Sequence, residues 1–414
     1  MERSKLDKHR KTLGTILPFV AVVALLLVGL WMNWPNVEYD GPPNAYDRFG
    51  SYRLAFSDIA WLYFRDGLWT HPLPYFDYPF EYPVGLGFLT YLLNSATRTM
   101  PQYFLLTSLA MALSALGIAA LVPRFPRGRL LLFALSPSVA LYFNHNWDMW
   151  AVLLMVVALL LFMRERDSLA TTVLTFAVWT KFFPILFLPF LVLDRLRRSG
   201  IWAAGRILVT CTAVSVAINA PVLLLAPARW WYFFAFNAAR PAHLGLWMFF
   251  DTLGLSTAEI NYLVTLLVVG GCVVLFVLQL RLAPGAWLPA GCAMLAWFFF
   301  VNKAYSPQYA LWIVVLLAVI GAVPALAVAW SAADLLYFGA LESWAALADN
   351  YGYDAQQWFT HYALLPATAL REAMLLLVIG WCVRRMYVSR RDPTQDREPW
   401  GSPASNSFGV TQNN

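Results

Sequence analysis

The sequence predicts an all-α protein that crosses a membrane many times. Hydrophobic residues make up 60% of its 414 residues and charged residues only 13%. A soluble chain of this length exposes enough surface to need many more polar residues. Its apolar runs of up to about 20 residues match the thickness of a bilayer, and strongly basic turns recur between them. Together these features predict a polytopic membrane protein of about twelve transmembrane helices.

The first apolar run covers residues 13–32 and follows a basic head at residues 1–11. It is too long for the core of a signal peptide, so we expect a retained first helix. Positive flanks stay in the cytoplasm, which places the N-terminus inside and the next loop outside. We therefore expect an integral membrane domain at residues 12–388, preceded by a cytoplasmic head.

Residues 33–100 form the predicted first extracytoplasmic loop. It begins as proline-rich coil, and one helix lying at the interface is expected over residues 52–68. Residues 82–94 are apolar but short. If they crossed the membrane, the basic turn at residues 123–129 would lie outside, against the positive-inside rule. We therefore interpret residues 82–94 as a surface or half-buried helix.

The rest of the chain alternates regularly between apolar runs and turns. Basic turns fall on the cytoplasmic side, further outer loops are expected at residues 226–259 and 342–361, and both termini are cytoplasmic. The polar tail at residues 389–414 is expected to be disordered. The predicted spans after the first loop are 103–122, 130–143, 147–163, 169–180, 182–193, 201–225, 262–280, 287–301, 309–320, 325–341 and 364–383.

The four cysteines all lie in apolar segments, which indicates reduced packing residues rather than a disulfide or metal framework. No Walker A sequence, GxSxG elbow, HExxH or CxxC motif is present. The sequence thus offers no soluble-enzyme signature of these kinds.

Unusual polar residues gather on the predicted outer face. Because charges at a membrane edge are costly, a cluster of both signs implies a polar cavity there. Carboxylates would supply a general base, and the Lys, Arg and His side chains an anion site. The cluster comprises Asp58, Arg65, Asp66, Asp77, Glu81, Asn144, His145, Asn146, Asp148, Lys181, Arg240, His243, Asp251, Asn302, Lys303, Ser306 and Gln308.

Five short motifs in this cluster resemble those of the C-type glycosyltransferase superfamily. The most similar group is family 87, the polyprenyl-phosphate-mannose-dependent mannosyltransferases, and the resemblance covers roughly residues 53–312. One departure is Tyr82-Pro83-Val84 where the family has Tyr-Pro-Pro, and another is the duplicated DYPFEYP, so the acceptor stays open. The motifs are Ser57-Asp58-Ile59, Tyr82-Pro83, Lys181-Phe182-Phe183-Pro184, Asn302-Lys303 and Ser306-Pro307-Gln308-Tyr309.

The resemblance implies an inverting transferase in the plasma membrane, with its active site outside. A sugar, mannose in the family, would pass from a polyprenyl-phosphate donor to a lipid or cell-envelope glycan, with Asp58 as the base. No cofactor and no nucleic acid are expected, although a Mg²⁺ held by carboxylates stays open. Expected donor-phosphate ligands are Lys303, Lys181, Arg240 and His243; expected acceptor or sugar ligands are Arg65, Asp77, Glu81, Tyr82, Asn146, Asp148 and Gln308.

Each of these residues also has a purely structural interpretation. Asp58 could cap a surface helix, and Asp148 could serve the dipole at the start of a span. Lys181 and Lys303 could be anchors that reach the interface. Asp77 and Glu81 flank prolines and could simply keep the loop hydrated.

Three other functions stay open at this point. An arabinofuranosyl donor fits the same scaffold, because nothing in the sequence identifies the sugar. A transporter or lipid flippase would also have about twelve spans, but it would be expected to place charges at the middle of the bilayer. An inactive scaffold that binds a cell-wall precursor is the third, and the presence of Asp58 argues against it.

Overall fold

The computed structural model describes residues 2–282 and 285–388. Within these ranges the chain is helical and forms no strand, only two isolated β-bridges. Six helices are long and apolar enough to cross a membrane, and four more apolar helices are shorter. The prediction of a polytopic all-α membrane protein is confirmed. The figure of about twelve spans stays a prediction, because six helices within the described ranges reach the length of a crossing.

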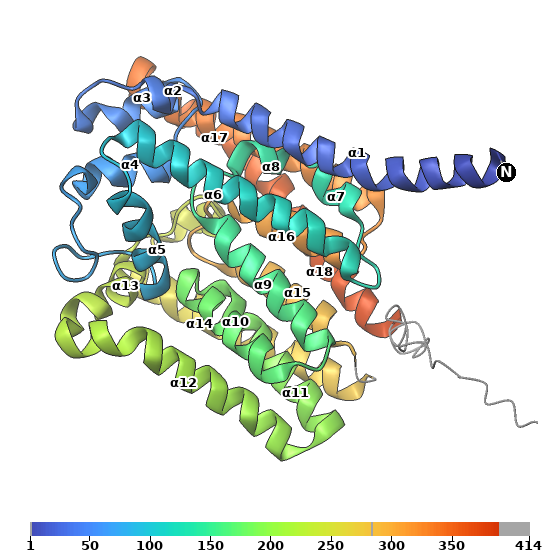
Figure 1. The fold of residues 1–414 in the computed structure, drawn as a ribbon. Helices are drawn as coiled ribbons and strands as arrows, with labels where there is room; N and C mark the ends of the chain where they lie inside the picture. The colour runs from blue at the N-terminus through green and yellow to red at the C-terminus, as the bar shows by residue number, and fades with distance from the viewer. Residues whose placement is uncertain (1, 283–284, 389–414) are drawn as a thin grey trace, which may run out of the picture.

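The first part of the chain runs from the long α1 to the long α6, with short helices between them (Figure 1). The basic head predicted at residues 1–11 is no separate element, since α1 begins at Glu2. The helices are α1 (Glu2–Met32), α2 (Pro35–Glu38), α3 (Tyr46–Tyr52), α4 (Asp58–Arg65), α5 (Val84–Ser95) and α6 (Met100–Leu121).

The single helix predicted over residues 52–68 is present but shorter, since α4 covers only Asp58–Arg65. The helix α3 ends at Tyr52, Leu54 adopts a left-handed backbone conformation with φ 55°, and α4 begins only at Asp58. Ser57 provides the N-cap of α4, because its Oγ accepts a hydrogen bond from the Ile59 N–H at 3.3 Å. This break places Asp58 at a helix start.

The helix α5 is half-buried, as predicted for residues 82–94, and that it does not cross the membrane stays a prediction. Its 12 residues extend about 18 Å at the α-helical rise, well short of a bilayer core of about 30 Å. A Cβ on Gly85 would lie 2.6 Å from the Trp179 carbonyl oxygen, so glycine permits α5 to approach the end of α10 (Asp167–Thr180) closely. That approach brings the residues preceding α5 beside Lys181.

Prolines break two of the predicted middle spans. Residues 130–143 form two short helices because Pro137 cannot continue the first, and residues 182–193 begin with a 3₁₀ helix from Phe183 that has Pro184 in its first turn. The elements of this part, besides α10, are α7 (Leu130–Ala134), α8 (Pro137–Tyr142), α9 (Asp148–Met163), η4 (Phe183–Phe187), α11 (Leu188–Ser199), α12 (Ile201–Leu225) and α13 (Pro227–Ala239).

Two of the predicted outer loops contain helices, while their placement outside the membrane stays a prediction. The outer loop predicted at residues 226–259 holds α13 and the 3₁₀ helix η5 (Leu246–Leu253), and the loop predicted at 342–361 is helical. The remaining helices are α14 (Thr257–Arg281), α15 (Trp287–Val301), α16 (Tyr309–Val319), α17 (Pro324–Phe359), the π-helical turn η6 (Thr360–Leu364) and α18 (Leu365–Val388).

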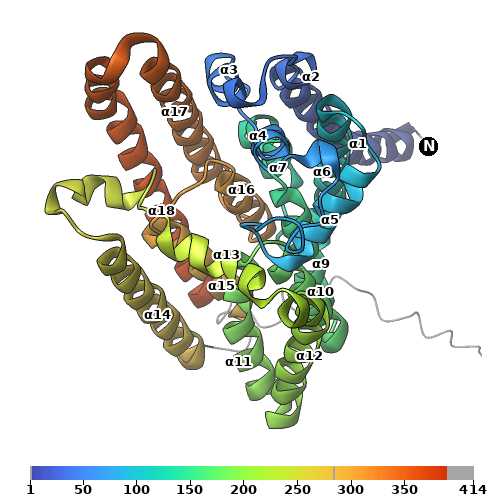
Figure 2. The ribbon, with the colours of Figure 1, turned by 90° about the vertical axis from the view of Figure 1, so that its left-hand side faces the viewer.

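The chain reverses direction within this helical stretch, as Figure 2 shows between α17 and α18. The Trp344 Nε1–H donates to Thr360 Oγ1 at 2.9 Å, a contact that a straight helix of this length would not allow. Polar sequence marked the end of the apolar run here but not the end of the helix. The tail predicted to be disordered, residues 389–414, lies outside the described residues.

The core and the two ends of the bundle have distinct characters. Every residue of α16 is buried, and the four cysteines are free thiols, as predicted. The short helices α2–α5 and α13 lie at one end, and the N-terminus and the end of α18 at the other (Figure 1). At that second end Arg129 donates to the Ala322 carbonyl oxygen at 3.2 Å. That the end with the basic turns faces the cytoplasm stays a prediction.

Candidate active site

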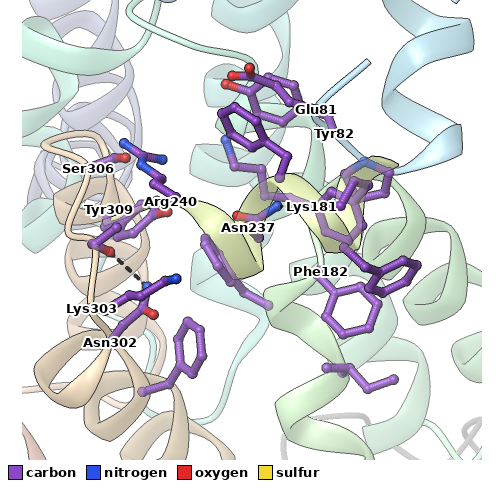
Figure 3. A pocket seen from close by; sticks show the side chains of 18 of the residues that line it. Glu81, Tyr82, Lys181, Phe182, Asn237, Arg240, Asn302, Lys303, Ser306 and Tyr309 are labelled. Carbon is purple, nitrogen blue, oxygen red and sulfur yellow. Dashed lines mark hydrogen bonds between the residues drawn. The ribbon is translucent and has the colours of Figure 1, made fainter. Parts of the chain in front are cut away.

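A cavity of about 430 Å³ lies at the end of the bundle that carries the short helices. Its walls come from the loop before α5, the segment after α10, the helix α13 and the loop between α15 and α16 (Figure 3). Its polar lining residues are Glu81, Tyr82, Lys181, Asn237, Arg240, Asn302, Lys303, Ser306, Gln308 and Tyr309. The remainder is mostly apolar, with Phe182, Phe183, Ile185, Leu186, Phe233, Phe234, Phe236, Val268 and Phe298. The cavity therefore suits an amphiphilic ligand.

Lys181 forms one cationic wall and is fully engaged by its neighbours. Its Nζ donates to Asp148 Oδ2 at 2.8 Å and to Asn146 Oδ1 at 3.1 Å. Its charge also lies 4.9 Å from the centre of the Tyr82 ring. The second oxygen of Asp148 accepts the Trp312 indole N–H at 2.7 Å, so this wholly buried carboxylate has a partner on each side. A buried ion pair satisfied in this way holds Lys181 in one position.

Asn146 links that wall to Asp58. Its Nδ2 donates to Asp58 Oδ2 at 2.6 Å and to the Tyr82 hydroxyl at 3.0 Å. Asp58 is half-buried at the first position of α4, where a negative charge meets the positive end of the helix dipole. Its backbone N–H donates to the His145 carbonyl oxygen at 2.9 Å. The carboxylate is thereby fixed one side chain away from the cavity.

Lys303 and Arg240 form the second cationic wall, on two loops that pair with each other. The His243 N–H donates to the Lys303 carbonyl oxygen at 2.7 Å, and the Tyr305 N–H donates to the His243 carbonyl oxygen at 3.0 Å. Lys303 Nζ donates to the Ala238 carbonyl oxygen at 3.0 Å. Desolvation, followed by repulsion from Arg240, lowers the pKa of Lys303. Among the described residues, no carboxylate forms an ion pair with either cation.

Three of the predicted site residues are placed differently from the rest. His243 is absent from the cavity lining and its side chain is exposed. Desolvation, followed by repulsion from Arg240, lowers its pKa, which disfavours a cationic role. Asp77 is exposed, and its carboxylate accepts the Leu73 N–H at 2.6 Å inside its own turn. Arg65 reaches the cavity only through Glu81, with ion pairs of 2.5 Å to Glu81 and 2.6 Å to Asp66.

Glu81 lies at the border between the cavity and the acidic loop, the stretch of residues 58–81 that carries Asp58, Asp66, Asp77 and Glu81. Burial raises the pKa of its carboxyl group, and the Arg65 guanidinium opposes that rise. Burial, followed by the charges of Asp58 and Glu81, raises the pKa of Tyr82 well above its usual value, so the hydroxyl stays protonated. At this rim of the cavity, burial and neighbouring charges therefore set the protonation of both side chains.

The structure brings most of the predicted residues together, although they come from distant parts of the sequence. Lining the cavity are Glu81, Tyr82, Lys181, Arg240, Lys303 and Gln308, while Asn146, Asp148 and Asp58 follow directly behind. The prediction missed Asn237 and Trp312, as well as Asn302, Ser306 and Tyr309 as ligands. The last three lie in quoted motifs, and a buried tryptophan that needs an acceptor was a signal for Trp312. Among the described residues, no group of three or more His, Cys, Asp or Glu side chains is arranged to hold a metal.

Residues 139–325 match the family model described as ALG3 protein, a dolichyl-phosphate-mannose-dependent mannosyltransferase. The match covers less than half of the chain. It includes Lys181, Arg240 and Lys303. It begins at residue 139 and therefore does not include Asp58 or Glu81. It supports a C-type glycosyltransferase at the level of the superfamily and does not identify family 87.

A solved structure, ArnT from Cupriavidus metallidurans bound to undecaprenyl phosphate, is similar over 92% of this chain and 79% of its own. The identity is 16% and the TM-score 0.43. No curated protein matches the chain.

Proposed function

We propose that this protein is a membrane glycosyltransferase that takes a sugar from a polyprenyl-phosphate donor. The observation that carries the proposal is the cavity itself. One part holds Lys181, Arg240 and Lys303, and the remainder is lined by aromatic and aliphatic side chains. A polyprenyl-phosphate donor needs both parts. Its phosphate binds the cations through charge-assisted hydrogen bonds, and its prenyl chain packs on the apolar surface. The match to the ALG3 family supports it.

The chemistry assigned to this arrangement is a single displacement with inversion. The acceptor hydroxyl gives its proton to Asp58 as its oxygen forms a bond to the anomeric carbon. The bond from that carbon to the phosphate oxygen breaks, and its electron pair leaves with polyprenyl phosphate. Lys303 and Arg240 hold the phosphate through charge-assisted hydrogen bonds, in the bound donor and as polyprenyl phosphate departs. The hydrogen bond from Asn146 keeps Asp58 oriented as the base.

The specific donor we propose is a polyprenyl-phosphate mannose, with a lipid or cell-envelope glycan as acceptor on the outer face. Mannose is supported by the matched family and by the motif resemblance. Arg65, Glu81 and Tyr82 border the cavity on the side of the acidic loop, where an acceptor would approach Asp58. An arabinofuranosyl donor is the second candidate, because the phosphate and prenyl contacts would be the same.

The test is sugar transfer in membranes that contain the native protein, Asp58→Asn or Asp77→Asn at equal abundance. Radiolabelled polyprenyl-phosphate mannose and radiolabelled polyprenyl-phosphate arabinose are supplied in separate assays. We expect the native protein to transfer label to a lipid or glycan from one of the two donors. Asp58→Asn should transfer it about 10²–10⁴-fold more slowly than the native protein. Asp77→Asn is the matched control, since it removes a carboxylate of the same loop that lies outside the cavity.

Equal transfer by the native protein and Asp58→Asn would exclude Asp58 as the base. Transfer from neither donor by folded native protein would contradict the proposed function and favour a transporter or a binding scaffold.

A further inference from the structure

Arg371, deep in α18, is buried completely, yet it lies outside the cavity. Its guanidinium carbon lies 3.6 Å from the centre of the Tyr305 ring and 3.9 Å from that of Tyr337. The Arg371 Nη2 donates to Glu372 Oε1 at 2.6 Å and to the Leu244 carbonyl oxygen at 2.9 Å. The two rings are nearly perpendicular, with 83° between their planes and 6.2 Å between their centres, so the guanidinium lies in the corner that they form. Contact of a planar cation with aromatic rings favours arginine over lysine.

Two of these partners belong to the loops that carry the second cationic wall. Tyr305 follows Lys303 by two residues, and Leu244 follows His243 directly. The two loops are already joined by the hydrogen bonds between His243 and Lys303 and between Tyr305 and His243. Arg371 therefore contacts both loops at once from a membrane helix.

Leu244 shows why such an anchor is needed. Its φ of 58° lies in the left-handed region, which a leucine adopts only when its surroundings impose it. Its side chain is buried against Tyr337, Leu341 and Leu364, while Arg371 binds its carbonyl oxygen. Both the side chain and the backbone of Leu244 are thus held in place, at the turn between Arg240 and η5.

We infer that Arg371, with the Tyr305 and Tyr337 rings, is a positioning residue that fixes Arg240 and Lys303 for the donor phosphate. The inference rests on the proposed function. It predicts that loosening the anchor weakens phosphate binding through those two cations, while the Asp58 side of the site keeps its geometry.

The test uses the full-length protein in nanodiscs, with undecaprenyl phosphate as the binding probe and donor KM and kcat measured in parallel. Arg371→Lys keeps the charge beside Glu372 but loses the contact with both rings. We expect donor KM and the dissociation constant of the probe to rise about 10-fold to 50-fold, with kcat changed less than about threefold.

Tyr305→Leu serves as a second variant in case Arg371→Lys folds poorly, because it leaves Arg371 and Glu372 intact. It should weaken the probe to a similar extent, whereas Tyr305→Phe, which keeps the aromatic face, should bind like the native protein. Combining Arg371→Lys or Tyr305→Leu with Lys303→Met should weaken binding by less than the product of the separate effects.

The outcomes separate this inference from the proposed function. Unchanged binding and KM in both Arg371→Lys and Tyr305→Leu would overturn the inference alone. A fall in kcat with unchanged KM, or independent effects in the combined variants, would also overturn it, because a merely structural role predicts either result. Failure of the native protein to bind the probe would instead contradict the proposed function.

Discussion

Lys181 and Lys303 line the same cavity, yet the two cations are held in different ways. Lys181 is paired with the buried carboxylate of Asp148 and bonded to Asn146, which in turn holds Asp58. Within the described part of the chain, Lys303 Nζ has one hydrogen-bond partner, the Ala238 carbonyl oxygen, and Arg240 is close enough to lower the pKa of Lys303. Two lysines of one cavity thus have opposite electrostatic surroundings.

The difference assigns a separate task to each wall. A lysine whose charge is already balanced gains less from an incoming phosphate than one that is repelled by a neighbouring cation. Phosphate binding by Lys303 and Arg240 relieves their mutual repulsion. Lys181 instead connects the cavity to the base through Asn146. We therefore expect changes at the Lys303 wall to affect donor binding and changes at the Lys181 wall to affect the rate and the fold.

The largest expected effect is that of Asp148→Asn, which removes the balance of charge at the Lys181 wall. Leaving a buried cation without its partner costs about 3–5 kcal/mol. The melting temperature in detergent should fall, and sugar transfer should be lost. In Asp148→Asn combined with Lys181→Met, the buried charge is gone and part of the stability should return. A melting temperature equal to that of the native protein for Asp148→Asn alone would refute this account of the wall.

The next largest effect separates the two lysines directly. Lys303→Met should raise the donor KM by about 10-fold to 100-fold, since a hydrogen bond to a charged group contributes about 1.5–3 kcal/mol. Lys181→Met should mainly lower kcat, because Asn146 loses the contact that orients it toward Asp58. Steady-state kinetics with varied donor measures both. The same KM and kcat changes in both variants would remove the distinction between the walls.

A smaller effect concerns pH. The pKa of Lys303 is lowered by desolvation and by Arg240, so the free protein loses this cation at a lower pH than an ordinary lysine would. Donor affinity should therefore fall as pH rises through that lowered pKa. Lys303→Arg stays charged and should move the alkaline loss to higher pH. The check is the dissociation constant of undecaprenyl phosphate across the alkaline range; identical profiles would exclude Lys303 as the titrating group.

The smallest effect is expected at Asp77, which the cavity does not use. Asp77→Asn removes a charge from an exposed turn but can still accept the Leu73 N–H. Transfer should stay within about twofold of the native rate, with a stability change of about 0.5 kcal/mol or less. A rate loss comparable to that of Asp58→Asn would show that the acidic loop acts on the acceptor through more than Asp58 and Glu81.

The sequence predicted the long helices well because a run of apolar residues directly reports contact with lipid. It failed where hydropathy and helix boundaries diverge. The polar stretch at residues 342–361 was expected to be a loop, but helices need only backbone hydrogen bonds and continue into the interface. The break between Tyr52 and Asp58 was missed although Ser57 is a local signal for a helix start, since its Oγ accepts the Ile59 N–H two residues on.

The candidate site was predictable by residue type but not by pairing. Asp58, Lys181 and Lys303 were identified from motifs, yet the bond between Asp58 and Asn146 joins residues 88 apart in the sequence. Trp312 on Asp148 spans 164 residues. No local pattern encodes such contacts, since they depend on how α4, α9 and α16 pack. For the same reason, Asp77 and His243 could not be distinguished from residues that face the cavity.

The most direct test of the account compares the binding of undecaprenyl phosphate and undecaprenol to the purified protein. The two lipids share a prenyl chain and differ in the phosphate. The account predicts at least about tenfold tighter binding of the phosphate, and loss of that preference when Arg240→Met and Lys303→Met are combined. Equal affinity of the native protein for both lipids would contradict the assignment of this cavity to a polyprenyl-phosphate donor.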